Sequence, residues 1–475
     1  MKKLILVFFV LLESIILMAQ GQYDNWHFGI GNSINFNNGY PSVQNGSQIV
    51  SVSCSASISD TLGNLLFYTN GDTIWNRNNT VMPNGMGLFG SSNVQQGVLI
   101  VPNLDTSKEI YYVFTIGNPV AGGAKELSYS IVDMRLNDSL GDVSTKNILL
   151  DSNVTEKLTA TKNYDDSDFW VVTKNLNGQF KSYAITKNGI NAQPVISVAG
   201  EPIQKGDYSG TIKISNNGCW LISTTRGIFG DPAFVEVLHF DNAEGSVSNG
   251  YSTTAIQHPY GLEFSPDSKK FYIGENDESP VYQFNLNEAN EKDILPSQLA
   301  VSDFYPATYS FQLAPDGKIY FVTQDTATLG CIKSPNDFSL FCNVDTSVVT
   351  GLAFNTYSLP NNFNLTYNGS LSCSQEIQGC IMPLQKLMPN AFTPNGDGLN
   401  DCFGIDHKIR DSLPFLDFAI YDRWGNQVFY STNEFNCWDG TYKGRPADQA
   451  NYVYYLRERT DCGYAIKTGY VVLIR

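Results

Sequence analysis

Short runs of apolar and aromatic residues alternate with polar turns along residues 21–365, and the pattern repeats. The string YGLEFSPDSKKFYI begins at Tyr260, and YSFQLAPDGKIYFV begins at Tyr309, about 49 residues later. A weaker copy, GTIKISNNGCWLIS, begins at Gly210. In each copy an apolar strand leads into a turn rich in Ser, Pro, Asp, Asn and Gly, and an aromatic strand follows. This order predicts a β-hairpin, because such residues favour tight turns and aromatic residues favour strands.

A strand-rich repeat of about 40–60 residues, with no helical periodicity between the copies, predicts a β-propeller. Six copies are visible, and the segments NWHFGIGNSINF, from Asn25, and TGLAFNTYSLPNNF, from Thr350, are expected to complete a seventh. Such a closure hides edge strands that otherwise promote aggregation. The fold class predicted for residues 21–365 is therefore an all-β propeller with seven blades, of the WD40 or YVTN-like type. The alternative is an array of β-sandwiches whose hairpins are similar by chance.

A second strand pattern follows at residues 389–475. The strings PFLDFAIYDRWGNQVFYS and IKTGYVVLIR are predicted strands, and DRWGN and DGTYKGRP are Gly-containing turns between strands. A module of this kind predicts a small Ig-like β-sandwich. Residues 366–388 have few aromatic residues and carry two cysteines, so they are expected to form a linker with a small disulfide loop.

The N-terminal string MKKLILVFFVLLESIILMAQ has the order of a secretory signal peptide: positive, apolar, then small residues. Residues 1–20 are therefore expected to direct export to the periplasm and to be cleaved. An uncleaved anchor is the alternative, which Glu13 disfavours because a carboxylate is costly inside a bilayer. No later segment reaches the about 18 apolar residues of a membrane span, so none is expected in the mature chain.

Composition narrows the function classes. Hydrophobic residues make up 42% of the chain, which is enough for packed cores, whereas only 16% of the residues are charged. The formal net charge is −16 at pH 7, and no basic patch with interleaved aromatic residues is present, so no nucleic-acid partner is expected.

Nine cysteines in an exported chain predict disulfides, and the odd number leaves at least one thiol over. The nearest local pairings are Cys331 with Cys342 and Cys373 with Cys380. Further along the chain, three cysteines compete for partners, and spacing does not choose between them: Cys402, Cys437 and Cys462.

The C-terminal module closely resembles the gliding-motility-associated C-terminal domain of Bacteroidetes, the type B sorting domain of the type IX secretion system. The residues that carry the resemblance are Asn390, Phe392, Thr393, Pro394, Asn395, Gly396, Asp397, Gly398, Asn400, Asp401, Arg423, Trp424, Gly425, Trp438, Asp439 and Gly440. The resemblance implies translocation across the outer membrane by the type IX machinery, followed by release or attachment at the cell surface. Cys402 and Cys437 stand where the family often has other residues, which implies an additional disulfide.

The string NAFTPNGDGLND allows two interpretations. Asn395, Asp397 and Asp401 match the middle of a calcium loop, whose oxygen ligands alternate around a Gly turn. However, Thr393 and Gly404 occupy positions where such a loop has carboxylates. The alternative is a turn in which the Asn and Asp side chains bind backbone N–H groups.

No catalytic motif stands out, and no cofactor other than calcium is suggested. The motif G-x-S-x-G and the P-loop are both missing. The histidines are isolated from one another along the chain: His27, His239, His258 and His407. The acidic pairs Asp165-Asp166 and Glu275 with Asp277 are the candidates for glycoside hydrolysis, which needs two carboxylates, but each pair lies in a predicted turn or loop.

The sequence therefore favours a non-catalytic protein that is secreted or held at the outer-membrane surface. Its propeller is expected to bind a protein or glycan ligand through loops, and its C-terminal domain to engage the secretion machinery. One alternative is a secreted enzyme that acts on polysaccharide, with acidic residues in the propeller channel. Another is an adhesin or structural part of the gliding or surface apparatus.

Overall fold

The computed structural model describes residues 21–475 except 118–124, 204–208, 228–231, 278, 289–290, 303–306, 324–325, 354–356, 366–372, 374–387, 405–415, 434–435 and 461–462. The expected signal peptide, His407, Cys380 and Cys462 lie outside the described residues. The chain divides into two compact units, Met1–Cys373 and Ser374–Arg475, which we call the propeller unit and the C-terminal unit. The division falls within the expected linker 366–388. No helix in the described part of the chain is long and apolar enough to span a membrane.

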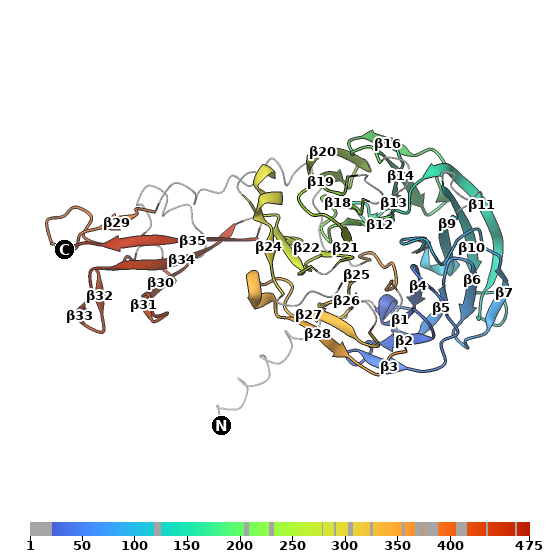
Figure 1. Cartoon of the computed structure of the whole chain (residues 1–475), viewed down its shortest axis with the longest axis horizontal. Helices are drawn as coiled ribbons and strands as arrows, with labels where there is room; N and C mark the ends of the chain where they lie inside the picture. The colour runs from blue at the N-terminus through green and yellow to red at the C-terminus, as the bar shows by residue number, and fades with distance from the viewer. Residues whose placement is uncertain are drawn as a thin grey trace, which may run out of the picture. The chain divides into compact units, whose positions relative to one another are not determined.

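Seven antiparallel sheets follow one another along the described residues of the propeller unit and surround a common centre (Figure 1). The first strands of successive sheets contact one another, so they line the centre. The first three sheets consist of β1 (Asn25–Phe28), β2 (Asn32–Asn35) and β3 (Ser42–Gln44); β4 (Ala56–Ser59), β5 (Leu65–Thr69), β6 (Thr73–Asn76) and β7 (Val81–Met86); β8 (Val98–Pro102), β9 (Ile110–Gly117), β10 (Lys125–Asp133) and β11 (Asp142–Val154).

The remaining four sheets repeat the same order. They consist of β12 (Leu158–Lys162), β13 (Phe169–Lys174), β14 (Gln179–Thr186), β15 (Gly189–Ile190) and β16 (Val195–Val198); β17 (Ile212–Ile214), β18 (Trp220–Thr225), β19 (Phe234–Asp241) and β20 (Ser246–Thr253); β21 (Pro259–Phe264), β22 (Lys270–Glu275), β23 (Tyr282–Asn285) and β24 (Leu299–Ala300); β25 (Thr308–Leu313), β26 (Ile319–Thr323), β27 (Leu329–Ile332) and β28 (Val344–Val349). The described residues also form five short 3₁₀ helices: η1 (Gly21–Tyr23), η2 (Thr106–Lys108), η3 (Glu291–Asp293), η4 (Leu295–Ser297) and η5 (Ser339–Cys342).

The repeated turns take the conformation that their residues favour. The last residue of SNNG, SPDS and APDG has a positive φ in each case: +75° at Gly218, +57° at Ser268 and +77° at Gly317. Glycine adopts this left-handed conformation without a steric penalty, which explains its use at two of the three positions. The predicted β-hairpins are confirmed at all three turns, where β17, β21 and β25 pair with the strands that follow them.

The ring closes between the last and the first sheet. Trp26 and Phe36 pack against Tyr320 of β26, with ring centroids 6.0 Å and 5.7 Å apart. The first sheet is built from residues 25–44 alone, so the expectation that the segment from Thr350 adds a strand to it is wrong for the described residues. That segment contacts the sheet through side chains instead: Asn32 bonds the backbone of Ala353, and Leu352 and Leu359 share a buried core with Trp26 and Phe28.

The C-terminal unit contains a five-stranded sheet and a two-stranded hairpin. The sheet order is β29 (Ala391–Phe392), β35 (Gly463–Leu473), β34 (Asn451–Thr460), β30 (Leu416–Tyr421) and β31 (Gln427–Ser431), and the hairpin is β32 (Thr441–Tyr442) with β33 (Arg445–Pro446). Aromatic side chains fill its core, and the isolated bridge between Phe403 and Trp438 closes over them. The predicted all-β chain, a propeller followed by a small β domain, is confirmed.

Candidate functional site

A segment of the chain fills the centre of the propeller. Residues 357–365, which we call the channel segment, run past the first strands of several sheets. The backbone N–H of Asn361 donates to the carbonyl of Ser55, 2.8 Å away. Its side-chain amide donates to the carbonyls of Val98 on β8 and Leu158 on β12, at 3.1 Å and 3.0 Å. One asparagine therefore ties three sheets together. Apolar contacts hold the segment as well, because Leu359, Phe363 and Leu365 are buried in the cores of the propeller unit.

A buried ion pair holds the next residue of the channel segment. Nζ of Lys213, on β17, lies 3.0 Å from Oε2 of Glu263 on β21. The same ammonium donates to Oε1 of Gln312 at 2.8 Å and to the carbonyl of Asn362 at 3.3 Å. Burying two charges is costly unless hydrogen bonds satisfy them. Here the ammonium makes the two bonds just given and Oε2 of Glu263 also accepts the N–H of Leu313 at 3.1 Å, whereas the side-chain nitrogen of Asn362 is buried with no hydrogen-bond partner among the described residues. The cavity left beside the segment measures about 20 Å³, roughly the room for a single water.

At one end of the channel four side chains from different elements meet, and we call them the mouth cluster. Arg226 follows β18, Tyr260 and Tyr309 lie near the starts of β21 and β25, and Tyr357 begins the channel segment. The Arg226 guanidinium lies 5.9 Å from the Tyr260 ring centre. The rings of Tyr260 and Tyr309 pack edge to face with their centres 5.5 Å apart, and the ring centres of Tyr309 and Tyr357 lie 4.6 Å apart. Tyr357 is 43% exposed, whereas Tyr260 and Tyr309 are buried, so the cluster presents one supported tyrosine to solvent.

Glu275 lies next to the mouth cluster, because its backbone pairs with Pro259 immediately before Tyr260. Its carboxylate is buried, and Oε2 accepts a hydrogen bond from the Ser279 hydroxyl at 3.0 Å. Burial is the main cause that raises the pKa of Glu275 above its ordinary value. The expected partner Asp277 instead lies 3.4 Å from Nε2 of His258. The pKa of one carboxyl, that of Glu275, is therefore raised, but the two acids of the predicted pair have different environments.

The other acidic pair forms an ordinary turn. Oδ1 of Asp165 accepts the N–H of Ser167 at 3.0 Å, and hydrogen bonds to Ser167 lower the pKa of Asp165. Asp166 has φ +59° and its carboxylate lies 3.1 Å from the Lys162 ammonium. These contacts support the turn interpretation of the sequence.

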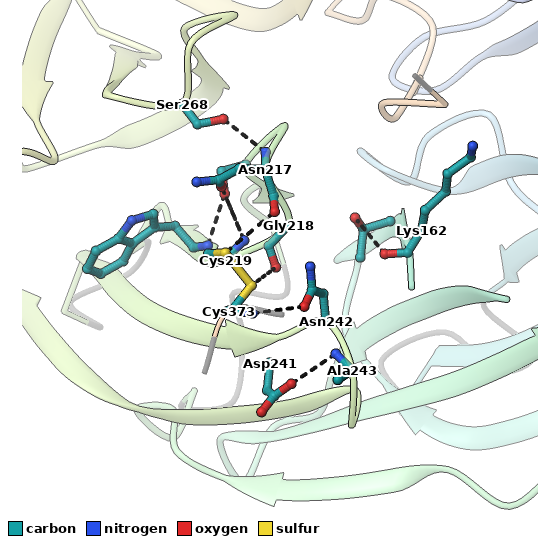
Figure 2. The surroundings of a disulfide bond; sticks show 12 residues. Lys162, Asn217, Gly218, Cys219, Asp241, Asn242, Ala243, Ser268 and Cys373 are labelled. Carbon is teal, nitrogen blue, oxygen red and sulfur yellow. Dashed lines mark hydrogen bonds between the residues drawn. A yellow bond between two sulfur atoms is a disulfide. The ribbon is translucent and has the colours of Figure 1, made fainter. Parts of the chain in front are cut away.

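A disulfide joins Cys373, the last residue of the propeller unit, to Cys219 at the β17–β18 turn (Figure 2). The backbone N–H of Cys373 donates to Oδ1 of Asn242 at 3.2 Å, and the N–H of Asn217 in the same turn donates to Ser268 in the next sheet at 3.0 Å. The expectation that Cys373 pairs with the nearby Cys380 is therefore wrong. The fold brings together two cysteines that lie 154 residues apart, and no local spacing indicates this.

The expected pairing of Cys331 with Cys342 is also wrong. Both are free, buried thiols. Cys331 packs in the core shared with the first sheet, whereas Cys342 packs against Tyr272 in the core shared with the preceding sheet. The two thiols thus lie on opposite faces of the last sheet, and burial raises their pKa values to about 12 and about 11.

In the C-terminal unit, Cys402 and Cys437 form a disulfide with their Cα atoms 5.6 Å apart. This is the additional crosslink that the departures from the family pattern imply. Each cysteine directly precedes one residue of the Phe403–Trp438 bridge, so the disulfide lies next to that bridge. The crosslink closes a loop whose ends are 35 residues apart, which lowers the entropy of the unfolded chain.

The three predicted calcium ligands lie together, but their oxygens bind the turn itself. Asp401 accepts the N–H groups of Gly396 and Gly398 at 2.6 Å and 2.7 Å, and these bonds lower its pKa. Asp397 accepts the side-chain amide of Asn395 at 2.9 Å. Among the described residues no group of three or more His, Cys, Asp or Glu side chains is arranged to hold a metal ion. The geometry supports a backbone-binding turn, and calcium binding stays a prediction.

The other motif residues of the C-terminal unit divide into buried and exposed positions. Phe392 and Trp438 belong to the core. Gly440 has φ +76°, which explains a glycine at that position. Arg423 and Trp424 lie in the β30–β31 turn and are exposed. The motif therefore combines core residues and turn residues that the fold requires with Arg423 and Trp424, two large side chains that the fold leaves exposed.

Sequence reasoning missed the channel segment, the mouth cluster and Cys219. Most of the channel segment belongs to the string TGLAFNTYSLPNNF, which is expected from the sequence to complete a blade. One signal was available for the mouth cluster: Tyr260 and Tyr309 occupy the same position in two repeats, so they were bound to lie at the same end of neighbouring sheets.

The fold and the C-terminal unit define an all-β protein in which a propeller precedes a small β module. Residues 386–473 match the family described as the CHU_C Type IX secretion signal domain. This match confirms the resemblance drawn from the motif residues. A type IX secretion signal domain implies secretion or location at the cell surface. No curated protein sequence matches the chain.

Solved structures show weak similarity to this chain. A Bacteroides uniformis protein proposed to be a 6-phosphogluconolactonase is 12% identical with a TM-score of 0.46, over 69% of this chain and 97% of its own. PorZ, a surface component of the type IX secretion system of Porphyromonas gingivalis, is 11% identical with a TM-score of 0.29, over 96% and 74%. The periplasmic gluconolactonase PpgL of Pseudomonas aeruginosa is 12% identical with a TM-score of 0.32, over 77% and 96%. Similarity at this level assigns neither activity nor partner.

Proposed function

We propose that this chain is a secreted or cell-surface binding protein without catalytic activity, exported by the type IX secretion system. In this proposal residues 1–20 direct the chain to the periplasm and residues 389–475 are the sorting module. Residues 366–388 are the linker, and residues 21–365 are the binding platform for a protein or glycan. The match of residues 386–473 to a secretion signal family supports the export part of the proposal.

The mouth cluster is the observation that carries the binding part. Tyr357 presents a partly exposed ring whose centre lies 4.6 Å from that of Tyr309, and Arg226 adds a positive charge beside Tyr260. Such a surface suits a ligand with a flat apolar face, either a sugar ring or an aromatic side chain of a protein. Because the channel segment occupies the centre of the propeller, a ligand would bind at the mouth rather than enter the channel.

The binding part is tested by screening the full mature chain against glycan and protein arrays. We expect a bound ligand whose affinity falls about tenfold or more in Tyr357→Ala, the size typical of an anchor residue. Tyr40→Ala is the matched control, because Tyr40 is 60% exposed in the loop between β2 and β3. Equal binding by the two variants would place the ligand elsewhere.

The export part is tested by deleting residues 389–475 in the bacterium that produces the protein. We expect the truncated chain to accumulate in the periplasm, because its sorting module is gone. Recovery of the truncated chain outside the cell would contradict the proposal.

A second candidate function, a polysaccharide-acting enzyme, is favoured by the buried carboxyl of Glu275 beside the mouth. A raised pKa is what a general acid in glycoside hydrolysis needs. Glycan turnover that disappears in Glu275→Gln, while the variant keeps its melting temperature, would establish this function. If the unaltered chain binds a glycan but does not hydrolyse it, the enzyme candidate fails and the binding proposal stands.

A further inference from the structure

The β30–β31 turn of the C-terminal unit is held in one conformation by its own side chains. Oδ1 of Asp422 accepts the N–H groups of Trp424 and Asn426, both at 2.8 Å. Oδ2 accepts the side-chain amide of Asn426 at 2.8 Å. Gly425 has φ +82°, a conformation that favours glycine. Asp422, Gly425 and Asn426 therefore account for the shape of the turn.

The turn uses the backbone of Trp424, but its shape does not depend on the side chains of Arg423 and Trp424. Trp424 is 77% exposed, whereas Trp438, the other tryptophan of the unit, is 1% exposed and donates from Nε1 to the carbonyl of Thr441 at 2.8 Å. The Arg423 guanidinium lies 5.2 Å from the Trp424 ring centre, so a cation–π contact orders the two side chains together. Among the described residues of the unit, Trp424 is the most exposed aromatic residue, and it lies in a turn whose shape other residues determine.

Two further facts give this tip a meaning. Tryptophan and arginine are the residues most enriched among those that dominate binding energy at protein interfaces. Holding them in place before binding lowers the entropic cost of association. The tip also belongs to the segment that matches a secretion signal family, so the unit that carries it has a protein partner to engage.

We propose that a protein of the secretion machinery recognises the C-terminal unit through Trp424 and Arg423. The inference rests on the proposed export by the type IX system and adds the surface that the machinery contacts. The partner fitted to this tip has an apolar pocket, which receives the indole, and carboxylates at its rim, which pair with the guanidinium. Because the two side chains lie against each other, binding of the partner would remove both of them from water together.

The test measures export of the full chain in the bacterium that produces it, by immunoblots of the medium, the cell surface and the periplasm. We expect the exported fraction to fall about tenfold or more in Trp424→Ala, as for an interface anchor. The exported fraction of Arg423→Glu is expected to fall as well, because the substitution replaces attraction to the carboxylates at the rim of the pocket by repulsion. Tyr470→Ala is the matched control, because Tyr470 is 72% exposed on β35. The chain with this substitution is expected to be exported as well as the parent chain.

Each outcome has a distinct meaning. If deletion of residues 389–475 blocks export but Trp424→Ala and Arg423→Glu are exported normally, the tip is not the recognised surface. If Tyr470→Ala falls as far as Trp424→Ala, a general loss of exposed aromatic surface explains the result and the inference is wrong. If the deleted chain is still exported, the proposed function itself fails. Should Trp424→Ala lose its melting transition, the Arg423→Glu result decides.

Discussion

The centres of the two units are stabilised in different ways. The propeller has a polar network at its centre, where Lys213 pairs with Glu263 and Gln312, and the side-chain amide of Asn361 donates to two strand carbonyls. The C-terminal unit is apolar at its centre, where rings pack against rings: Phe392 lies 5.4 Å from Trp438, and Trp438 lies 4.7 Å from Tyr452.

This difference follows from geometry. A propeller brings the first strands of seven sheets to one axis, and their backbone carbonyls need hydrogen-bond donors that a purely apolar filling cannot supply. The side-chain amide of Asn361 supplies two of these donors. The small C-terminal unit has its sheet hydrogen-bonded within itself, so aromatic packing is sufficient. The propeller centre should therefore be most sensitive to loss of a polar partner, and the C-terminal unit to loss of volume.

The largest effect is expected for Trp438→Ala. Removing a buried tryptophan costs about 3–5 kcal/mol of unfolding free energy, which is most of what a small domain possesses. Hydrogen exchange followed by mass spectrometry should show loss of protection in the C-terminal unit while the propeller unit stays protected. Trp424→Ala is the control and should change the free energy by less than about 0.5 kcal/mol, because its side chain is exposed. Equal loss of protection in both variants would contradict the aromatic-core account.

Lys213→Met tests the polar centre. It leaves Glu263 buried and charged without the ammonium that it pairs with, which costs about 3–5 kcal/mol of unfolding free energy. Urea unfolding measures the change. Lys333→Met is the matched control, because its ion pair with Asp345, 2.7 Å away, lies at the surface and should contribute little. A variant at Lys213 as stable as the parent would show that apolar filling serves the centre equally well.

A smaller effect is expected when the pH is lowered. His27 is buried, stacks on Tyr68 at 3.9 Å and bonds Ser47, and burial lowers its pKa to about 3. The unfolded chain binds the extra proton near pH 6.5, so the stability contribution is present above that pH. It is lost as pH falls towards 3, by about 1.4 kcal/mol per pH unit. The difference in unfolding free energy between the parent chain and His27→Gln, measured from pH 7 to pH 5, should shrink accordingly; a constant difference would exclude this cause.

The smallest effect is expected for added calcium. Because Asp397 and Asp401 already accept hydrogen bonds within their turn, the melting temperature should not change. A rise that is abolished in Asp397→Ala would instead establish the calcium site, and with it a second kind of polar stabilisation in the C-terminal unit.

Local chemistry accounts for what was predictable from the sequence. The turns ending at Gly218, Ser268 and Gly317 were recognisable because a few adjacent residues determine a hairpin, and their repetition indicates a propeller. The motif around Asp397 was recognisable for the same reason. These features need no knowledge of which distant residues meet.

The channel segment and the Cys219–Cys373 disulfide depend on contacts across the whole ring. Asn361 bonds carbonyls that lie 263 and 203 residues away, and no periodic pattern marks an asparagine for such a position. The mouth cluster is intermediate, because the repeat places Tyr260 and Tyr309 at equivalent positions but says nothing of Tyr357 or Arg226. Residues that act from several sheets at once thus become recognisable only when the ring is assembled.

The bond between Cys219 and Cys373 also gives a pulling force a second path into the propeller. A pull on the chain beyond Cys373 divides at that residue between the backbone, which leads to residues 357–365, and the crosslink to the β17–β18 turn. The channel segment therefore bears less of the load than it would without the disulfide.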